Sequence, residues 1–324
     1  MARRAAAALI LAAEAALVAV APLVGVLAAA LGGRALRVVA MAHAYCAEHL
    51  RATAACARLD AADEDGHYAV MRRFVSAIYD TIAHVTGARV VVEESAETEA
   101  ILTAGERPLV VLSLHAGEGD TLVVIHHLLC RWRRRTRIVM HERLRLDPLI
   151  DVLGRRLPNR FVDPRGGDTE VEIAAMARAM PPDGAVLIFP EGRNFSPQHR
   201  LRSILRLRRA GHAEEAASAE RMQHVSAPRP GGALAAIEAA PEADVVFVAH
   251  AGFPRGLGEA WRQLPRAPTV RVRLWLARAA EVPHDREARI DWLFGWWRTL
   301  DAWVGSAQSS IPASASQSAT GSGG

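Results

Sequence analysis

Short apolar runs rich in β-branched residues alternate with helically patterned segments along most of this chain. The apolar runs are 88–94, 108–115, 137–142, 185–192, 244–250 and 269–277, and the helical patterns lie at 119–131, 168–180, 200–224 and 285–304. Strands that are separated by helices favour parallel pairing, and a parallel sheet has to be covered on both faces. The alternation therefore predicts an α/β fold with a mainly parallel central sheet covered by helices.

Residues 5–33 form the only long apolar block of the chain. At about 1.5 Å per residue, a helix of this length exceeds the roughly 30 Å hydrocarbon core of a bilayer. Glu14 would cost on the order of 3 kcal/mol at the bilayer centre, and Pro22 with Gly25 favours a break in the helix. We therefore expect an N-terminal apolar membrane-anchoring helical segment, kinked, re-entrant or spanning, with a cleaved signal peptide as the third alternative.

The sequence divides into successive regions. Phe74, Ile78 and Ile82 recur at helical spacing before the first predicted strand, whereas the last residues are too rich in Ser, Ala and Gly to bury a core. The predicted regions are a membrane-associating segment at 1–42, a helical lead-in at 43–87, an α/β domain at 88–305 and a disordered tail at 306–324.

All 39 basic residues are arginine, because the chain contains no lysine. This excludes a phosphate-binding loop with its lysine and any Schiff-base chemistry, since both need a primary amine. The three cysteines, Cys46, Cys56 and Cys130, are odd in number and lack metal-ligand spacing, so we expect them to be reduced in a cytosol-facing protein.

The densest cluster of positive charge is the segment CRWRRRTR at 130–137. Arginines beside Trp132 are compatible with a nucleic-acid surface. A solvated connection is the simpler interpretation, and beside a membrane anchor it would attract anionic lipid head groups at about 1 kcal/mol per charge. We therefore expect contact with a membrane surface and no nucleic-acid partner.

His115 and Asp120 interrupt two apolar runs in the segment VVLSLHAGEGDTLVVIHHLL. His115 follows a predicted strand directly, and Asp120 falls in the first turn of the next predicted helix. A neutral imidazole can accept a proton from a hydroxyl, and a carboxylate can hold its other ring nitrogen and stabilise the imidazolium. The pair therefore resembles two members of a catalytic triad whose nucleophile is supplied by the substrate.

A second carboxylate follows a second predicted strand in the segment VLIFPEGRNFSP at 186–197. Because parallel strands end at the same edge of a sheet, Glu191 can face the same cleft as His115. Alone, Glu191 would more often be a solvated loop acid, and His115 a partly buried histidine held by a nearby acid. The two strand ends together favour a shared active site.

The motif H-x-x-x-x-D at a strand end, followed by F-P-E-G, resembles the glycerolipid acyltransferase family, which includes 1-acylglycerol-3-phosphate acyltransferases. The resemblance covers roughly residues 85–280, with looser matches at 140–154 and 228–232. It implies that His115 is the general base on the acceptor hydroxyl and that Asp120 orients it. It also implies that the segment Phe189, Pro190, Glu191 and Gly192 contributes to acceptor binding.

One departure from the family pattern concerns the phosphate of the acceptor. The family commonly continues F-P-E-G-T-R, whereas this chain has Arg193 at the threonine position and Asn194 at the arginine position. We expect Arg193 to bind the substrate phosphate. Arg165, Arg200 and Arg202 are the alternatives.

The resemblance implies direct transfer of a fatty acyl group from acyl-CoA or an acyl-carrier protein to the hydroxyl of a lysophospholipid, in phospholipid biosynthesis. Neither a metal nor a cofactor is required, because the acyl thioester is a co-substrate. We expect a membrane-associated enzyme whose active domain faces the cytoplasm. The alternatives are transfer to another amphipathic acceptor such as a glycolipid, and a non-catalytic lipid-binding homologue.

Overall fold

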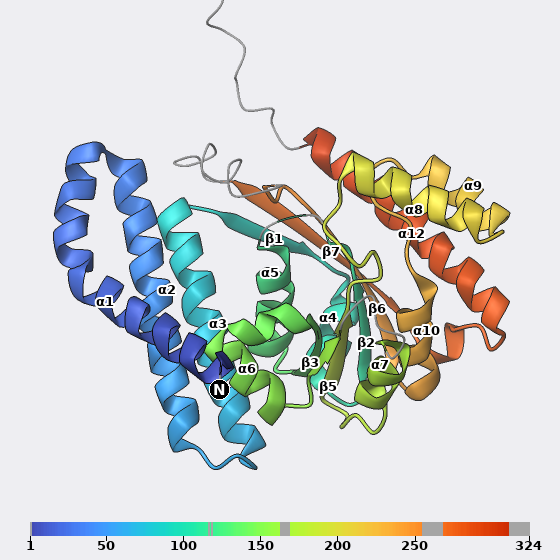
Figure 1. The fold of residues 1–324 in the computed structure, drawn as a ribbon. Helices are drawn as coiled ribbons and strands as arrows, with labels where there is room; N and C mark the ends of the chain where they lie inside the picture. Colours follow the sequence, from blue (N-terminus) through green and yellow to red (C-terminus); the bar gives the residue numbers. More distant parts are fainter. Residues whose placement is uncertain (1, 116, 118, 163–168, 255–267, 311–324) are drawn as a thin grey trace, which may run out of the picture.

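A computed structural model describes residues 2–310 of the chain apart from 116, 118, 163–168 and 255–267. Its centre is a seven-stranded sheet with the strand order β1-β7-β6-β2-β5-β3-β4 (Figure 1). The strands are β1 (Arg89–Glu93), β2 (Leu109–Ser113), β3 (Arg135–His141), β4 (Arg160–Val162), β5 (Gly184–Ile188), β6 (Asp244–Ala251) and β7 (Thr269–Ala277). Every pair in this sheet is parallel except β6 with β7. The predicted, mainly parallel α/β fold is confirmed.

The central strands read as continuous apolar runs because both of their faces are covered. Every residue of β2, β5 and β6 is buried, which is the pattern of parallel strands between two layers of helices. Strand β4 was not predicted, since its three residues are too few to show a period.

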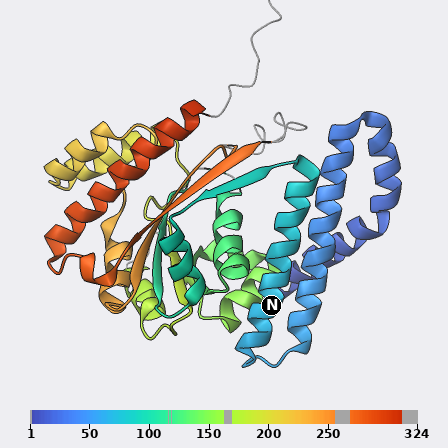
Figure 2. The same ribbon diagram turned by 180° about the vertical axis from the view of Figure 1, so that it is seen from behind.

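Helices cover both faces of the sheet (Figures 1 and 2). The helices after the first strand are α4 (Ala96–Ala104), α5 (Asp120–His126), α6 (Pro148–Arg156), α7 (Thr169–Ala177), α8 (Pro197–Arg209), α9 (Ala213–Arg221), α10 (Pro230–Ala239) and α12 (Arg286–Ser310). A π-helical turn at His127–Arg131 continues α5, and a 3₁₀ turn at Glu142–Leu146 follows β3.

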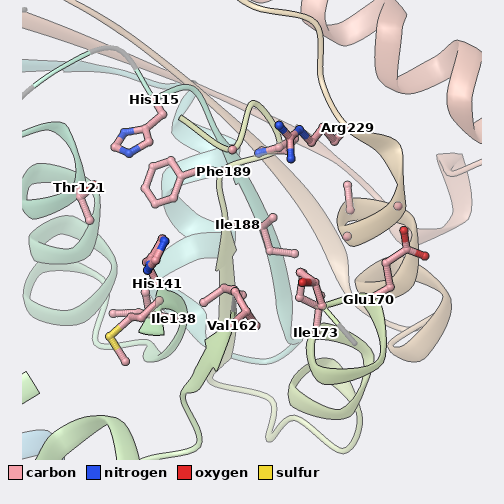
Figure 3. A pocket seen from close by; sticks show the side chains of 18 of the residues that line it. His115, Thr121, Ile138, His141, Val162, Glu170, Ile173, Ile188, Phe189 and Arg229 are labelled. Atoms are coloured by element: carbon pink, nitrogen blue, oxygen red, sulfur yellow. The ribbon is translucent and has the colours of Figure 1, made fainter. Parts of the chain in front are cut away.

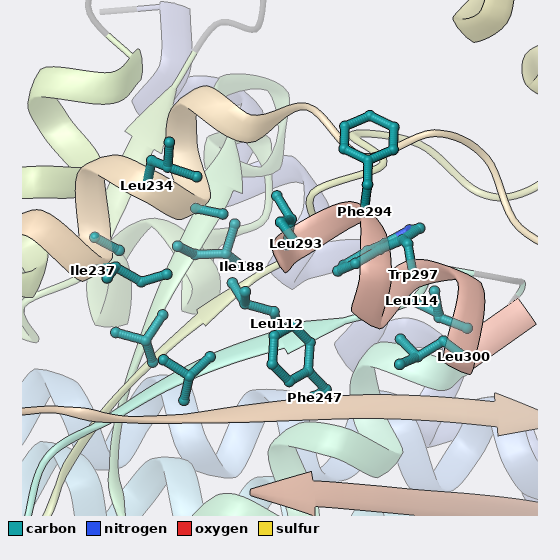
Figure 4. Packing of buried hydrophobic residues seen from close by; sticks show 14 of the residues in the cluster. Leu112, Leu114, Ile188, Leu234, Ile237, Phe247, Leu293, Phe294, Trp297 and Leu300 are labelled. Atoms are coloured by element: carbon teal, nitrogen blue, oxygen red, sulfur yellow. The ribbon is translucent and has the colours of Figure 1, made fainter. Parts of the chain in front are cut away.

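Alternate residues of β2 belong to two separate cores. Val110 and Leu112 pack with α7, α10 and α12, whereas Leu109 and Val111 pack with α4 and α5. Figure 4 shows the first core, in which Phe247 and Ile188 of the sheet meet Trp297 of α12. Successive side chains of a strand point to opposite faces, so the run PLVVLSLH serves both layers.

Two long helices precede this domain, and α3 (Glu64–Thr86) connects them to it. Helix α1 (Ala2–Leu31) changes direction part-way along (Figure 1), and Pro22 lies inside it, where a proline removes a backbone hydrogen bond. Helix α2 (Gly33–Arg58) begins directly after Gly32, whose φ is +110°. The chain turns at Gly32, and the boundary predicted at residue 42 falls inside α2.

Within the part of the chain that the structure describes, one helix is long and apolar enough to cross a membrane, by length and composition only: residues Ala5–Leu31. Its side chains are largely uncovered by protein, since Leu23, Val26 and Leu31 are 72%, 72% and 82% exposed. Helix α1 also contacts α6 and the turn at Glu142–Leu146, so it is not separate from the α/β domain.

Glu14 is buried on the protein side of α1. Its Oε2 lies 2.8 Å from Nδ1 of His49 on α2, and the other ring nitrogen of His49 lies 3.0 Å from Oδ1 of Asp147. Asp147 in turn caps α6 by accepting a hydrogen bond from the N–H of Ile150. The Glu14 carboxylate, which made a simple membrane span costly in the sequence analysis, therefore links α1 through His49 and Asp147 to α2 and α6.

Two sequence predictions about helix ends need correction. The pattern at 200–224 is two helices, because Gly211 with φ +81° separates α8 from α9. Helix α12 continues to Ser310, so residues 306–310 are helical rather than part of a tail. The rest of the predicted tail, 311–324, lies outside the described residues.

The arginine-rich segment 130–137 is used inside the protein. Arg134 is fully buried and donates hydrogen bonds to the backbone carbonyls of Ile101, Leu102, Arg107 and Pro182. Arg135 pairs with Glu64 and Asp65, and Arg131 with Glu94 and Glu99. The expectation of a solvated basic stretch is therefore wrong for Arg134, whereas Arg131 and Arg135 are partly exposed and paired with carboxylates.

Candidate active site

The adjacent strands β2 and β5 bring the two sequence motifs together. They pair in parallel from Leu109 with Ala185 to Leu112 with Ile188, so they end at the same edge of the sheet. His115 follows the end of β2, and Glu191 follows the end of β5. The backbone N–H of His115 lies 3.4 Å from Oε1 of Glu191, so the two strand ends lie side by side.

His115 and Asp120 form the predicted pair. Nδ1 of His115 lies 3.0 Å from Oδ2 of Asp120. Asp120 begins α5, and its side chain is 1% exposed, whereas that of His115 is 26% exposed. Gly119 precedes the helix with φ +93°, a conformation that favours glycine. The buried carboxylate therefore holds one imidazole nitrogen while the ring itself remains accessible.

The other contacts of Asp120 keep it charged. Burial by itself raises the pKa of Asp120, but the hydrogen bond from His115, the nearby His250 and the N–H of Gly117 outweigh burial, so the pKa is lowered. Thr121 donates both its backbone N–H and its hydroxyl to Oδ1. An anionic, fixed Asp120 can stabilise a positive charge that forms on His115.

His250 is a part of the site that the sequence analysis missed. It lies in β6, next to β2, and its Nε2 is 2.9 Å from the carbonyl oxygen of Leu114 and 3.6 Å from Oδ2 of Asp120. The side chain is fully buried, and burial lowers its pKa. A histidine near the end of a buried strand beside the His115 strand was the available signal, but the run DVVFVAH was interpreted only as core.

Glu191 lies beneath the pocket rather than in its wall. It is 1% exposed and accepts a hydrogen bond of 2.9 Å from the N–H of Ser226 at Oε2. Burial raises its pKa to about 8, against the lowering effect of the N–H groups of Ser226 and His115. Glu191 therefore ties the β5 loop to the catalytic loop and to the segment before α10.

A pocket of about 490 Å³ opens beside His115 (Figure 3). Phe189 packs on His115 with ring centroids 4.6 Å apart, and Pro190 and Gly192 also line the pocket. The farther wall is apolar and comes from four elements or their ends, namely β3, β4, α7 and β5: Ile138, Met140, Val162, Ile173 and Ile188. A histidine thus faces one end of a mainly apolar cavity.

The structure places Arg229, and not Arg193, in the pocket wall. Arg229 immediately precedes α10, and its backbone N–H donates to the carbonyl of Pro190 at 2.8 Å. Arg193 is exposed and stands outside this wall. Its positive charge nevertheless lowers the pKa of Arg229 further, after the effect of burial. The prediction that Arg193 is the nearest phosphate ligand is therefore not supported by its position.

The other arginine alternatives are elsewhere. Arg200 donates to the backbone carbonyls of Met222 and Glu220. Arg202 lies on α8, and Arg165 lies outside the described residues. Among the described residues, no group of three or more His, Cys, Asp or Glu side chains could hold a metal ion.

The glycines of the segment PRPGG permit close packing behind the pocket. A Cβ on Gly231 would lie 1.8 Å from Oε1 of Glu170, and one on Gly232 would lie 2.8 Å from Cδ1 of Ile173. A side chain at either position would therefore displace the end of the Glu170 or the Ile173 side chain on α7. This contact places Arg229 at the pocket.

A family model described as Acyltransferase matches residues 85–249, more than half of the chain. The chain belongs to the acyltransferase family. The match contains both the His115–Asp120 pair and the F-P-E-G segment, and it begins where the sequence resemblance was expected to begin. The acyltransferase therefore carries the paired motifs of its family on a mainly parallel sheet.

Among solved structures, the 1-acyl-sn-glycerophosphate (LPA) acyltransferase PlsC from Thermotoga maritima is similar to this acyltransferase. The TM-score is 0.41 at 12% sequence identity, covering 80% of this chain and 97% of that protein. A comparison with curated proteins finds no significant match.

Proposed function

We propose that this acyltransferase moves a fatty acyl group from the thioester of acyl-CoA or an acyl-carrier protein to the hydroxyl of a lysophospholipid such as 1-acylglycerol-3-phosphate. One observation carries the proposal: His115, held by Asp120 through Nδ1, stands at one end of an apolar pocket of about 490 Å³. The second imidazole nitrogen, Nε2, is then the one that can meet a substrate. A base beside an apolar cavity suits a reaction on a lipid.

The reaction proceeds in one direct transfer. Nε2 of His115 accepts the proton of the acceptor hydroxyl as its oxygen attacks the thioester carbonyl carbon. The tetrahedral intermediate collapses with cleavage of the carbon–sulfur bond, and the imidazolium returns its proton to the departing thiolate. Asp120 stabilises the imidazolium between these two proton transfers, so no acyl-enzyme is needed.

The acyl chain lies in the apolar part of the pocket. Its walls at Ile138, Val162 and Ile173 offer no charge to a hydrocarbon. Phe189 lies between this apolar wall and His115, which positions the thioester carbon beside the base (Figure 3).

Arg229 binds the phosphate of the acceptor. It lines the same pocket as His115 and lies at the N-terminus of α10, where the helix dipole also favours an anion. A guanidinium can donate two parallel hydrogen bonds to a phosphate. This assignment gives the role expected of Arg193 to a residue of the later PRPGG segment.

The enzyme works at a membrane, with its active domain on the cytoplasmic side. The exposed apolar side chains of α1 support membrane association, because a bilayer would cover them. The three cysteines are free, as suits a reducing compartment. The contact of Glu14 with His49 and Asp147 means that α1 brings the α/β domain close to the lipid surface as one unit.

Purified enzyme, labelled acyl-CoA and a panel of acceptors test the function. The panel contains lysophosphatidate, other lysophospholipids and a glycolipid, and His115→Ala is the matched inactive variant. We expect transfer to lysophosphatidate and a loss of about 10²- to 10⁴-fold in His115→Ala. Transfer to the glycolipid alone would support the alternative acceptor. The absence of transfer to every acceptor would contradict an acyltransferase activity.

A further inference from the structure

The guanidinium groups of five arginines near the active site have no carboxylate or carbonyl partner among the residues that the structure describes. They are Arg193, Arg202, Arg206, Arg209 and Arg229, and we call them the α8 arginine cluster. Other arginines of α8 are used internally, since Arg208 pairs with Glu220 and Arg200 donates to two backbone carbonyls. The cluster is therefore a concentration of positive charge that the described residues leave uncompensated.

The cluster is continuous from the active-site pocket to the end of α8. Arg229 lines the pocket with His115, whereas three members on α8 line a shallow surface hollow: Arg202, Arg206 and Arg209. His199 lies between these two ends. Burial lowers its pKa, and the charges that lower it further are all arginines: Arg229, Arg193, Arg206 and Arg202. The arginines that line the pocket and those that line the hollow on α8 are thus close enough to act on the same histidine.

The hollow suits a ligand with several anionic groups. Arg202, Arg206 and Arg209 recur at positions i, i+4 and i+7, so they share one face of α8 over about 10 Å. A single phosphate engages one or two guanidinium groups, whereas groups spread over such a distance fit a polyanion.

The position of α8 favours a soluble ligand over a lipid surface. Helices α8 and α9 lie at the opposite end of the molecule from α1 in both views (Figures 1 and 2). The exposed apolar residues that a bilayer would cover are on α1. When α1 contacts a membrane, the three α8 members Arg202, Arg206 and Arg209 are therefore far from the lipid head groups that surround α1.

We propose that the face of α8 formed by Arg202, Arg206 and Arg209 binds the phosphates of the CoA moiety of an acyl-CoA donor. This inference rests on the proposed function, because it requires the thioester to lie at His115. The pantetheine arm separates the thioester from the 3′-phosphate and the diphosphate. These phosphates therefore lie beyond the pocket, and the three arginines of α8 are a positively charged surface that can bind them there.

Direct binding of CoA to the full-length enzyme in uncharged detergent micelles tests the site, measured by titration calorimetry. We expect Arg202→Ala and Arg206→Ala each to raise the Kd for CoA about tenfold, and the triple variant with Arg209→Ala to raise it about 100-fold. Arg208→Ala is the matched control on the same helix, because Arg208 already pairs with Glu220. Its Kd should stay within about twofold of the wild-type value. Dephospho-CoA should bind the wild type more weakly and show a smaller loss in the variants.

Kinetics and vesicle binding distinguish CoA from an acyl-carrier protein or a lipid surface as the ligand of the cluster. The triple variant should raise the KM for acyl-CoA while leaving the KM for the acceptor and the binding to phosphatidylglycerol vesicles unchanged. An unchanged Kd for CoA in the triple variant would overturn the inference. So would a loss seen only with acyl-carrier protein or only with vesicles, which would assign the cluster to those partners. Lost CoA binding in an enzyme that transfers no acyl group would retain the site and refute the proposed function.

A second inference rests on His250, whose contacts are independent of the α8 arginine cluster. Nε2 of His250 faces only acceptors, the Leu114 carbonyl at 2.9 Å and Oδ2 of Asp120 at 3.6 Å, so it carries the hydrogen. Its Nδ1 is buried without a hydrogen-bond partner among the described residues. Maintaining this arrangement costs free energy, which points to a function.

We infer that His250 is a positioning residue for the catalytic pair. Its N–H holds the end of β2 at Leu114, directly before His115, and faces the oxygen of Asp120 that binds the imidazole. The titratable groups around it are Asp120, His115 and, across a small cavity, Glu191 and His224. An uncharged imidazole N–H at this position holds the Asp120 carboxylate in place and leaves its negative charge to interact with His115.

Two substitutions test this role, again on the premise of the proposed reaction. His250→Leu removes the donor, whereas His250→Gln keeps an N–H group near the same position. We expect His250→Leu to lower kcat about tenfold with little change in KM and to shift the acid limb of the pH profile. The His250→Gln enzyme should keep most of the wild-type activity. If both variants lose the same kcat and neither shifts the pH profile, His250 only packs in the core and does not position the pair. A dead His115→Ala enzyme beside a fully active His250→Leu enzyme would refute only this inference.

Discussion

Replacing His49 with phenylalanine should destabilise the N-terminal helices, because His49 stands between two carboxylates. Its ring is 1% exposed and lies 2.8 Å from Glu14 and 3.0 Å from Asp147. Removing one partner of a buried ion pair costs about 3 to 5 kcal/mol. We expect about 3 kcal/mol, at the lower end, since Asp147 keeps its hydrogen bond to the N–H of Ile150 and is partly exposed.

The effect should depend on pH with a defined sign. Burial alone lowers the pKa of His49, but the hydrogen bonds and charges of Asp147 and Glu14 outweigh it and raise the pKa. Stabilisation by charged His49 is therefore complete below about pH 6.5 and is lost as the pH rises through the raised value. Burial alone raises the pKa of Asp147, but the hydrogen bond to His49 outweighs burial and lowers the pKa. The stability that the charged Asp147 contributes is therefore lost only well below about pH 4. The difference between wild type and variant should peak between about pH 5 and 6.5.

Thermal unfolding in mild detergent micelles, recorded from pH 5 to 9, measures this difference. A loss of about 3 kcal/mol corresponds to a fall in Tm of roughly 6 °C at acidic pH. The double variant Glu14→Leu with His49→Phe should recover part of that loss, because the unpaired charge on α1 is then gone. A variant with the wild-type Tm at pH 6, or a difference that grows with pH, would refute the described contact between α1, α2 and α6.

Other substitutions separate the roles of residues around the pocket. Asp120→Asn should lower kcat by at least about 100-fold, measured by steady-state kinetics, and should also cost about 1 to 3 kcal/mol of stability, because its amide would face the N–H of Gly117 or Thr121. Arg229→Ala should raise the KM for lysophosphatidate by about one to two orders of magnitude, and Arg193→Ala by less, with the KM for acyl-CoA as the internal control. If Arg193→Ala has the larger effect, the phosphate lies outside the pocket wall. Glu191→Gln should cost about 1 to 3 kcal/mol of stability, because its amide group would place an N–H donor against the N–H of Ser226 or His115. Chemical denaturation measures this loss, and an unchanged free energy of unfolding would contradict the described hydrogen bonds.

The sequence alone determined the fold class and the pairing of His115 with Asp120. The strands β2 and β5 could be predicted from their apolar runs, because a strand that is covered on both faces must be apolar throughout. His115 and Asp120 are five positions apart, so the local turn from β2 into α5 is enough to bring them together. Local order along the chain therefore carried this part of the prediction.

Only the tertiary structure decided which polar residues meet across the chain. Glu14 finds its partner 35 positions away, and His250 faces a carbonyl 136 positions away. Arg134 of the basic segment turns inward onto four carbonyls, whereas Arg229 reaches the pocket that Arg193 was expected to serve. A charged or polar side chain is tolerated in a core only when a partner satisfies it, and that partner is set by the packing of distant elements. Sequence pattern marks where such a residue occurs, but the folded chain alone selects what it binds.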